Sequence, residues 1–374
     1  GRTSGPMKRA AATEVVNRSR VRALVKGEIE RVTKGPIVYW MSRDQRARDN
    51  WALLYAQELA TAHACPLVVC FNLLSSFLGA PIRHFHFMLH GLAEVEKELR
   101  AHNIDFVLLR GDPVQTLPEY LKRVSACAVV SDFSPLRINR QWKDGLSKAI
   151  TIPFHEVDAH NVVPAWLAST QQETAARTIR PKLWDKSKQF FDEFPALERH
   201  SFGTVDAVEV QVRVDELLAQ MDVDRSVGPV TWAKPGPAAG DAALKAFLQK
   251  GLDGYEDRNK IAKNATSNLS PWLHYGNLSA QRCIMDAMKA KKEKASAKRT
   301  EAADGFIEEI FIRRELAENF CLYNAHYDSL AGAAQWARDT LKEHEKDKRE
   351  FVYTCEQLEA GKTHDKLWNA AQLE

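Results

Sequence analysis

The chain has 374 residues, of which 45% are hydrophobic and 27% charged, and its formal net charge is +3. This length exceeds a typical single domain, and the composition is that of a globular protein rather than a disordered chain. No apolar run approaches the roughly 18 residues of a membrane span, and the N-terminal residues lack the apolar centre of a secretory signal.

The six cysteines are scattered along the chain and form no CxxC pair. Such spacing predicts neither a disulfide framework nor a metal site, and it favours a reducing intracellular compartment. We therefore expect an intracellular protein without a metal.

Positive charge gathers in two stretches. Residues 1–36 hold nine Lys or Arg against three Glu, and the run KAKKEKASAKR covers residues 289–299. Such runs can attract phosphate backbones, although charge runs are more often solvated tails and loops. We predict that residues 1–35 form a basic, flexible leader.

Strand and helix patterns alternate after the leader. Helical patterns cover residues 50–62, 82–100 and 113–124, and they separate short β-rich runs. The β-rich runs are IVYW (37–40), PLVVCF (66–71), DFVLLR (105–110), ACAVVSDF (126–133) and IPFHEV (152–157). This order predicts an α/β domain with a parallel, Rossmann-like sheet, covered by helices on both faces, over residues 36–166.

Polar residues follow the predicted strands, where ligands of such sheets gather. Asp132, Ser134, Arg137 and Asn161 are candidates for binding a ligand at this edge. No GxGxxG follows the first strand, so an ordinary dinucleotide site is not supported.

The second half of the chain has no strand signal. Residues 167–240 are predicted to be a helical connector that ends in a Pro- and Gly-rich linker, and residues 241–374 to be an all-α domain. The expected helices of the all-α domain cover residues 241–252, 277–291, 304–323, 331–346 and 354–360.

The stretch SNLSP (267–271) has the pattern of a helix start. Ser270 can cap free amides, and Pro271 suits the first helical position. With Ser267 and Asn268 beside it, this helix end could bind a phosphate or pyrophosphate. On the local pattern alone, an ordinary cap in a polar loop is the favoured interpretation.

Two further features have alternative readings. Glu309 and Arg313 are spaced i,i+4 and could be a surface ion pair, or the carboxyl could act in a site. Trp368 is one of nine tryptophans and could belong to a core or an interface.

Taken together, several ordered motifs resemble the class II cyclobutane pyrimidine dimer photolyases of the photolyase/cryptochrome family. The resemblance runs from about residue 37 to the end of the chain. The motifs are VYWMSRDQRARDNWALL (38–54), DFSPLR (132–137), VDAHNVVPAW (157–166), GYEDRN (254–259), SNLSPWLHYG (267–276), EEIFIRRELAENFCLYN (308–324) and GKTHDKLWNA (361–370).

The resemblance implies FAD, reduced and anionic in the active form, in the helical domain. Tyr255, Ser267, Asn268, Leu269 and Ser270 match positions that bind FAD in this family. An antenna chromophore such as a deazaflavin is implied as a possibility for the α/β domain.

Other matched positions imply roles in repair. Glu309 matches the active-site acid, which also contacts the cofactor, and burial near a flavin would raise the pKa of its carboxyl. Trp368 matches a member of a tryptophan electron-transfer chain. Arg258, Arg313 and Asn319 are candidates for contacting DNA or the lesion.

The implied reaction is light-driven electron transfer from the flavin, which splits a pyrimidine dimer flipped out of UV-damaged DNA. We expect a monomer located with DNA, in a nucleus, organelle or nucleoid, and not at a membrane. The alternatives are a cryptochrome-like blue-light receptor without repair activity and an inactive, truncated fragment, because the usual C-terminal segment of the family is not found in this sequence.

Overall fold

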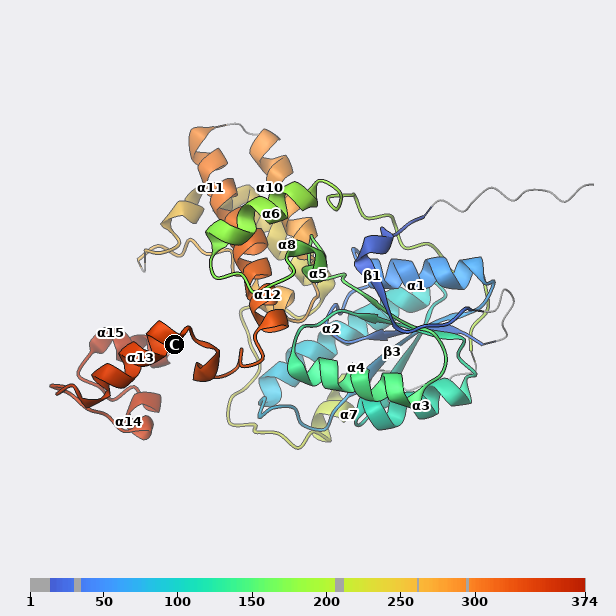
Figure 1. The fold of residues 1–374 in the computed structure, drawn as a ribbon, viewed down its shortest axis with the longest axis horizontal. Coiled ribbons are helices and arrows are strands. Elements are labelled where there is room, and N and C mark those ends of the chain that lie inside the picture. Colours follow the sequence, from blue (N-terminus) through green and yellow to red (C-terminus); the bar gives the residue numbers. More distant parts are fainter. Residues whose placement is uncertain (1–13, 30–34, 206–211, 261, 294–295, 374) are drawn as a thin grey trace, which may run out of the picture. The chain divides into compact units, whose positions relative to one another are not determined.

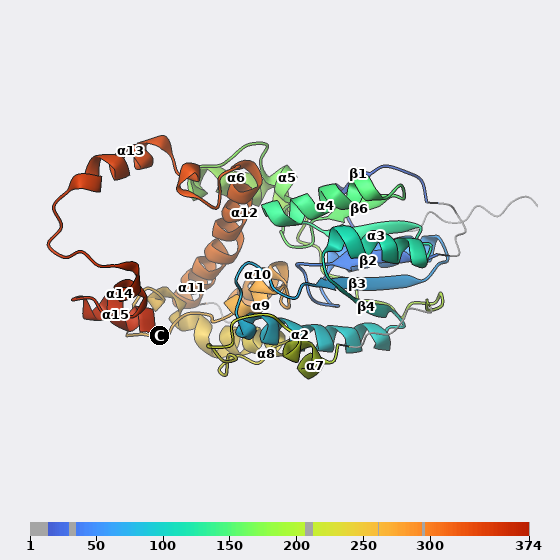
Figure 2. The ribbon, with the colours of Figure 1, turned by 90° about the horizontal axis from the view of Figure 1, so that it is seen from below.

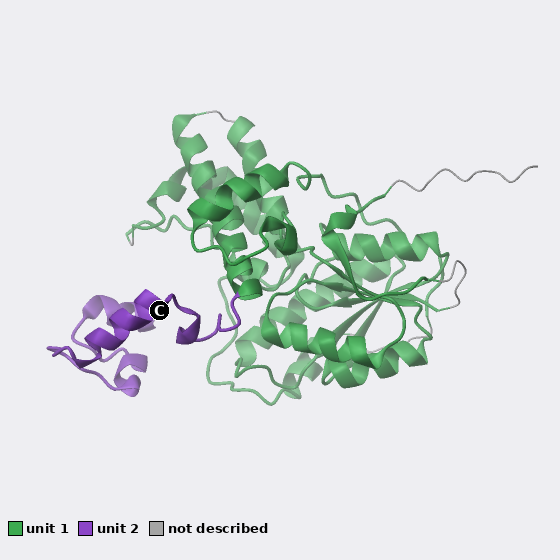
Figure 3. Ribbon diagram, in the orientation of Figure 1, with its two compact units in different colours: residues 1–323 green, residues 324–374 purple. Residues whose placement is uncertain are grey.

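The computed structural model describes residues 14–29, 35–205, 212–260, 262–293 and 296–373 (Figure 1). The chain divides into two compact units, residues 1–323 and residues 324–374 (Figure 3). The predicted boundaries at residues 166 and 240 fall within the first unit and stay a prediction. Among the described residues, no helix is long and apolar enough to span a membrane.

A six-stranded sheet with the order β1-β6-β5-β2-β3-β4 forms the centre of the N-terminal half. Five strands follow the predicted runs and pair in parallel. They are β2 (Ile37–Met41), β3 (Leu67–Leu73), β4 (Asp105–Arg110), β5 (Ala128–Asp132) and β6 (Phe154–Val157).

The sixth strand corrects the predicted leader. Residues Val21–Val25 form β1, which pairs antiparallel with β6 at the edge of the sheet. Upstream, the Arg20 guanidinium is buried and donates to the carbonyls of Asn161 and Val162 at 2.9 and 2.7 Å. This part of the leader is therefore built into the fold, because its arginine satisfies buried carbonyl groups.

Helices cover both faces of the sheet, as the continuous apolar strands predicted. Tyr39 and Met41 of β2 face the helices α1 (Trp51–Ala62) and α2 (Ile82–Ala101). Val38 and Trp40 face the opposite side, where α3 (Pro113–Arg123) and α4 (Arg137–Ala149) pack. Figure 2 shows α2 on one side of the strands and α3 and α4 on the other. The helix α4 was not predicted from the sequence.

The rest of the first unit is helical, and the predicted fold class is confirmed. Tyr255, Leu269, Trp272 and Phe306 belong to its hydrophobic core. The helices are α5 (Ala165–Ala168), α6 (Ala176–Ser187), α7 (Val214–Ala219), α8 (Pro237–Ala246), α9 (Ser270–His274), α10 (Ala280–Glu293), α11 (Ala297–Ile307) and α12 (Arg314–Tyr323).

The helix predicted over 304–323 is not a single regular α-helix. A π-helical turn, Glu308–Arg313, lies between α11 and α12, and is called here the π turn. A similar turn, Phe247–Gly251, follows α8 and leads into a 3₁₀ turn at Leu252–Asp257. Such turns insert an extra residue into a helix, and the hydrophobic pattern did not reveal them.

The second unit contains α13 (Gln335–Glu343), α14 (Cys355–Glu359) and α15 (Lys366–Leu373). The first two are shorter than the helices predicted over 331–346 and 354–360, and α15 was not predicted. None of these three helices has a buried residue. A capping box, in which Thr354 and Gln357 satisfy each other's backbone amides, starts α14.

Candidate functional site

Tyr255 is held in the helical core by aromatic neighbours. The 3₁₀ turn Leu252–Asp257 directs it inward, and its ring packs edge-on against Phe306 and Phe247, with centroids 5.5 and 5.7 Å apart. Burial raises the pKa of its phenol, so the hydroxyl stays protonated at neutral pH.

Arg258 connects Tyr255 with Glu309. Its guanidinium carbon lies 4.8 Å from the centroid of the Tyr255 ring, within the range of a cation–π contact. Its Nη2 donates to Glu309 Oε1 at 3.3 Å. Three residues that the sequence singled out, from segments 51 residues apart, are thus brought together.

Glycine at position 305 permits this approach. A Cβ there would lie 2.5 Å from Glu256 Oε1 and 3.6 Å from Arg258 Nη1. The 3₁₀ turn therefore lies directly against α11, one turn before Glu309.

The side chain of Glu309 is 45% exposed. The alternative of an i,i+4 pair between Glu309 and Arg313 is wrong, because Arg313 Nε donates to Glu308 Oε1 at 3.2 Å. The π turn changes which side chains face each other, so the α-helical spacing rule does not apply.

Glu308 lies between two arginines. Arg180 of α6 donates to its carboxylate at 3.0 and 2.6 Å, and Arg313 donates from the other side. The hydrogen bond from Arg180 is the largest cause that lowers the pKa of Glu308. The Glu308 carboxylate is ionised at neutral pH, and its single negative charge is shared by Arg180 and Arg313.

The segment 267–270 is anchored by one buried side chain. Leu269 is fully buried in the helical core, while Ser267 is half-buried and Asn268 and Ser270 are exposed. Asn268 adopts a left-handed backbone with φ of 54°, and its Oδ1 accepts from Thr266 Oγ1 at 2.9 Å. The polar side chains of the segment are thus presented at the surface.

The predicted cap at Ser270 is wrong in detail. Ser270 is the first residue of α9, Leu269 precedes the helix, and no side chain caps it. Proline is tolerated throughout a first helical turn, so Pro271 at the second position lets the helix begin one residue earlier than predicted.

Asn319 and Trp368 lie in different environments. Asn319 is buried, accepts from the Glu173 amide at 2.7 Å and donates to the Gln171 carbonyl at 2.9 Å. Both halves of its amide are occupied, which favours a structural role over the predicted contact with a lesion. Trp368, in the second unit, is 48% exposed on α15.

The polar residues at the carboxyl edge of the sheet are also used internally. Asp132 accepts from the amides of Arg43 and Asp44 at 2.9 and 3.0 Å, and so fixes the turn after β2. The Asn161 amide group donates to Asp158 Oδ2 at 3.0 Å. Asp132, Ser134 and Asn161 are buried, so these candidate ligand residues serve the fold.

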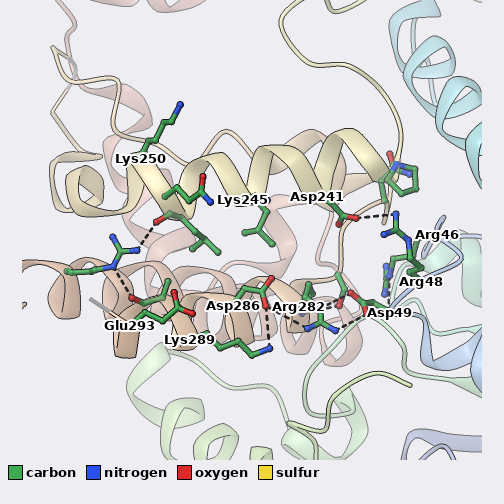
Figure 4. Close-up of a pocket in the computed structure, with 18 residues that line it drawn as sticks. Arg46, Arg48, Asp49, Asp241, Lys245, Lys250, Arg282, Asp286, Lys289 and Glu293 are labelled. Carbon is green, nitrogen blue, oxygen red and sulfur yellow. Dashed lines mark hydrogen bonds and ion pairs between the residues drawn. The ribbon is translucent and has the colours of Figure 1, made fainter. Parts of the chain in front are cut away.

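A pocket of about 960 Å³ lies between α8 and α10 (Figure 4) and was not predicted from the sequence. Arg282 reaches across its end to Asp49, with its Nε and Nη2 2.9 and 3.0 Å from the two carboxylate oxygens. Arg48 reaches Asp241 at 3.2 Å. None of the predicted site residues lines the pocket. Its two ion pairs join the segment between β2 and α1 to the helices α8 and α10.

No group of three or more His, Cys, Asp or Glu in the described part of the chain is arranged to hold a metal ion. The candidate site is instead an aromatic core with a carboxylate, a guanidinium and the surface-presented segment 267–270. Hydroxyl, amide and guanidinium groups of this kind suit an anionic or hydroxyl-rich organic ligand better than a metal ion.

Comparison with known proteins identifies the family. The DNA photolyase family model matches residues 37–198. The chain is 48% identical to a deoxyribodipyrimidine photo-lyase of Potorous tridactylus over 90% of its own length and 63% of that protein's. It is 44% identical to a protein of the same name from Arabidopsis thaliana, over 97% of this chain and 75% of the relative.

A solved structure supports the fold alone. The class III photolyase of Agrobacterium tumefaciens aligns with a TM-score of 0.64 at 20% identity, over 91% of this chain and 68% of that one. The chain thus spans 63% to 75% of the length of these relatives, and the resemblance drawn from the sequence motifs is confirmed. We conclude that the chain belongs to the DNA photolyase family.

Proposed function

We propose that this protein repairs cyclobutane pyrimidine dimers in DNA in a light-dependent reaction that uses FAD. The observation that carries the proposal is the convergence of Tyr255, Arg258 and Glu309 in one site. The identity of 44–48% to proteins named deoxyribodipyrimidine photo-lyase gives it independent support.

The residues present fit FAD. Ser267, Asn268 and Ser270 leave hydroxyl and amide groups at the surface, and the first amides of α9 have no side-chain cap. Leu269 fixes this segment to the core. Small donors and free amides suit a diphosphate and a polyhydroxyl chain, and when bound in its reduced, anionic form the flavin would supply the electron for ring opening.

Glu309 would hydrogen-bond the lesion. A protonated carboxyl can donate to a pyrimidine carbonyl and stabilise negative charge that arrives on the dimer. Arg258 Nη2 donates to Glu309 Oε1 at 3.3 Å. A lesion that hydrogen-bonds this carboxyl group would take the place of Arg258.

The DNA contacts follow from charge and exposure. Arg313 is exposed and shares Glu308 with Arg180, which leaves positive charge at the surface for a phosphate. A dimer inside a duplex must be flipped out to reach such a site. This substrate would place the protein with DNA inside the cell.

Trp368 and an antenna chromophore complete the proposal. Trp368 is proposed as a member of an electron-transfer chain that photoreduces the flavin, by its match to the family motif GKTHDKLWNA. An antenna such as a deazaflavin rests on the family resemblance alone, because Asp132, Ser134 and Asn161 are engaged within the fold.

The test is repair of a single thymine dimer in a short duplex by the purified protein with FAD and reductant. Light-dependent return of intact thymines, absent in the dark, is expected. Stable flavin binding and photoreduction without repair would favour the cryptochrome-like alternative. Failure to bind FAD would favour the inactive fragment.

A further inference from the structure

Two histidines of α2 lie together on one face of the helix. His86 and His90 are spaced i,i+4, which places their side chains one turn apart, and their ring centroids are 4.3 Å apart. His86 is half-buried and His90 is exposed. The two imidazoles, called here the histidine pair, are therefore within reach of one small ligand from solvent.

The histidine pair makes no polar contact within the fold. Among the described residues, seven other histidines use a ring nitrogen in a hydrogen bond, as His84 does with the Tyr275 hydroxyl at 3.1 Å. In the same part of the chain, the rings of His86 and His90 contact each other and have no hydrogen bond or ion pair. The lone pair of each neutral imidazole is thus available to a ligand.

The surroundings of the pair favour a cationic ligand. Burial lowers the pKa of His86 and the neighbouring His90 lowers it further, while the exposed Asp215 of α7 opposes this shift. His86 is therefore neutral at neutral pH, which is the form that metal ions bind. One turn after His90, Glu94 accepts from the Ala238 amide at 2.7 Å. Figure 2 shows α7 and α8 beside α2.

The spacing of the two rings suits one shared metal ion. Imidazole nitrogens lie about 2.0–2.1 Å from such an ion, so two rings that bind it at a right angle have centroids about 4.5 Å apart. A tetrahedral angle would separate the centroids by about 5.2 Å. The observed 4.3 Å is closer to the right angle. Right angles between nitrogen and oxygen ligands are typical of Cu²⁺ and Ni²⁺.

We propose that His86 and His90 bind a divalent transition-metal ion, and that they hold Cu²⁺ more tightly than Ni²⁺ or Zn²⁺. Two histidines at i,i+4 on one helix face are a recurrent pair of metal ligands. No third His, Cys, Asp or Glu of the described residues completes a metal-binding group, so water fills the other positions around the ion. The pair is thus a surface site for exchangeable metal, and it is independent of the proposed function.

The test is calorimetric titration of the purified protein with Cu²⁺. His86→Gln and His90→Gln should each weaken one site by about tenfold or more, because the second imidazole binds an ion that the first already holds close to it. The matched control is His84→Gln, which removes a histidine of the same helix about 200° away from His86 around the helix axis. This control should keep the site.

Two further readouts identify the ligands. Electron paramagnetic resonance of the Cu²⁺ complex should show two imidazole nitrogens in the unmodified protein and in His84→Gln. Ni²⁺ should raise the unfolding temperature of these two proteins but not that of the double variant His86→Gln, His90→Gln, because an ion that binds only the folded state stabilises it. Equal Cu²⁺ affinity in the unmodified protein and the double variant would overturn the proposal, as would a spectrum of the unmodified protein with a single nitrogen.

Discussion

At the scale of single residues, the site depends on which partner each charged group has. Glu308 and Glu309 are adjacent in the sequence, yet Glu308 pairs with Arg180 and Arg313, while Glu309 pairs with Arg258. Glu308 is therefore held by two arginines and Glu309 by one long contact of 3.3 Å. The more weakly held carboxyl is the one that can exchange its partner for a substrate.

Replacing Glu309 should impair repair more than binding. Glu309→Leu removes the donor to the dimer, and we expect the repair rate per absorbed photon to decrease by about tenfold or more. Glu309→Gln keeps an N–H donor and should retain most of the rate. Repair yields with matched flavin content provide the measurement, and equal yields for Leu and the native residue would rule out the proposed role.

Glu315 should make stability depend on pH. It is buried, accepts from the Val162 amide at 2.6 Å, and burial raises its pKa to about 8. The folded state therefore binds a proton that the unfolded state releases at a lower pH. The free energy of unfolding should decrease as the pH rises from about 4.5 to about 8, by about 1.4 kcal/mol per unit of pKa difference at most.

Glu315→Gln tests this dependence. The amide oxygen can still accept from the backbone but does not titrate, so the decrease between pH 4.5 and 8 should become smaller. Urea unfolding of both proteins across this pH range provides the comparison. Parallel pH curves would show that another group is responsible.

At the scale of elements, two glycines differ in what surrounds them. A Cβ on Gly276, which has a φ of 64°, would lie 2.2 Å from the Arg43 carbonyl oxygen and 2.7 Å from the Asp44 Cα. A Cβ on Gly305 would meet the flexible end of Glu256. Of these two glycines, only Gly276 would place a Cβ against backbone atoms, at the contact between the end of α9 and the turn after β2.

The two alanine variants should therefore diverge. Gly276→Ala should lower the free energy of unfolding by about 2 kcal/mol or more, through strain at positive φ and a backbone clash. Gly305→Ala should change it by less than about 1 kcal/mol, because Glu256 can rotate away and alanine favours the helix. Denaturant titration of both variants measures the two free energies of unfolding. Similar losses in the two variants would contradict the distinction between a backbone and a side-chain neighbour.

The sequence predicted elements more reliably than their junctions. The strands of the parallel sheet were found because they are short, mostly apolar runs that contain Val or Ile. β1 and α4 were missed because VRALV lies in a basic stretch and RINRQWKDGLSKA buries only Lys143 and Leu146. The π turn was missed because its extra residue leaves no mark in a hydrophobic pattern.

Site residues were predicted by motif, but their partners were not. The pairing of Arg258 with Glu309 depends on how the 3₁₀ turn packs on α11, which involves residues 51 positions apart. Asn319 shows the limit of a motif, since its amide serves the backbone of residues 171 and 173. A motif gives the residue type, and only the fold shows which groups it faces.

At the scale of the first unit, the sheet half and the helical half are joined by ion pairs between partly buried side chains. Arg43 pairs with Glu318 at 2.8 Å, and Arg282 pairs with Asp49 across the pocket. Arg43 and Glu318 hold each other ionised, and the pKa of Glu318 is lowered to about 2, with burial opposing this shift and Arg43 the largest cause that favours it. Breaking one partner of such a pair leaves an uncompensated charge.

Arg282 and Asp49 should therefore be coupled. Arg282→Met and Asp49→Asn should each lower the free energy of unfolding, and the double variant should lose less than their sum by about 0.5–3 kcal/mol. A double-mutant cycle by urea unfolding measures this coupling. If the two losses of unfolding free energy simply add, the bidentate contact between Arg282 and Asp49 makes no net contribution to stability.

The π turn has one more consequence, which concerns helical phase. One residue of an α-helix occupies about 100° of rotation. Here α11 directs Phe306 and Ile307 into the helical core, while α12 directs Glu315 and Glu318 toward Val162 and Arg43. The wider winding of the π turn absorbs its extra residue, so α12 keeps its own face directed at these partners. An extra residue carried without such a turn would rotate α12 by about that angle and direct Glu315 and Glu318 away from Val162 and Arg43.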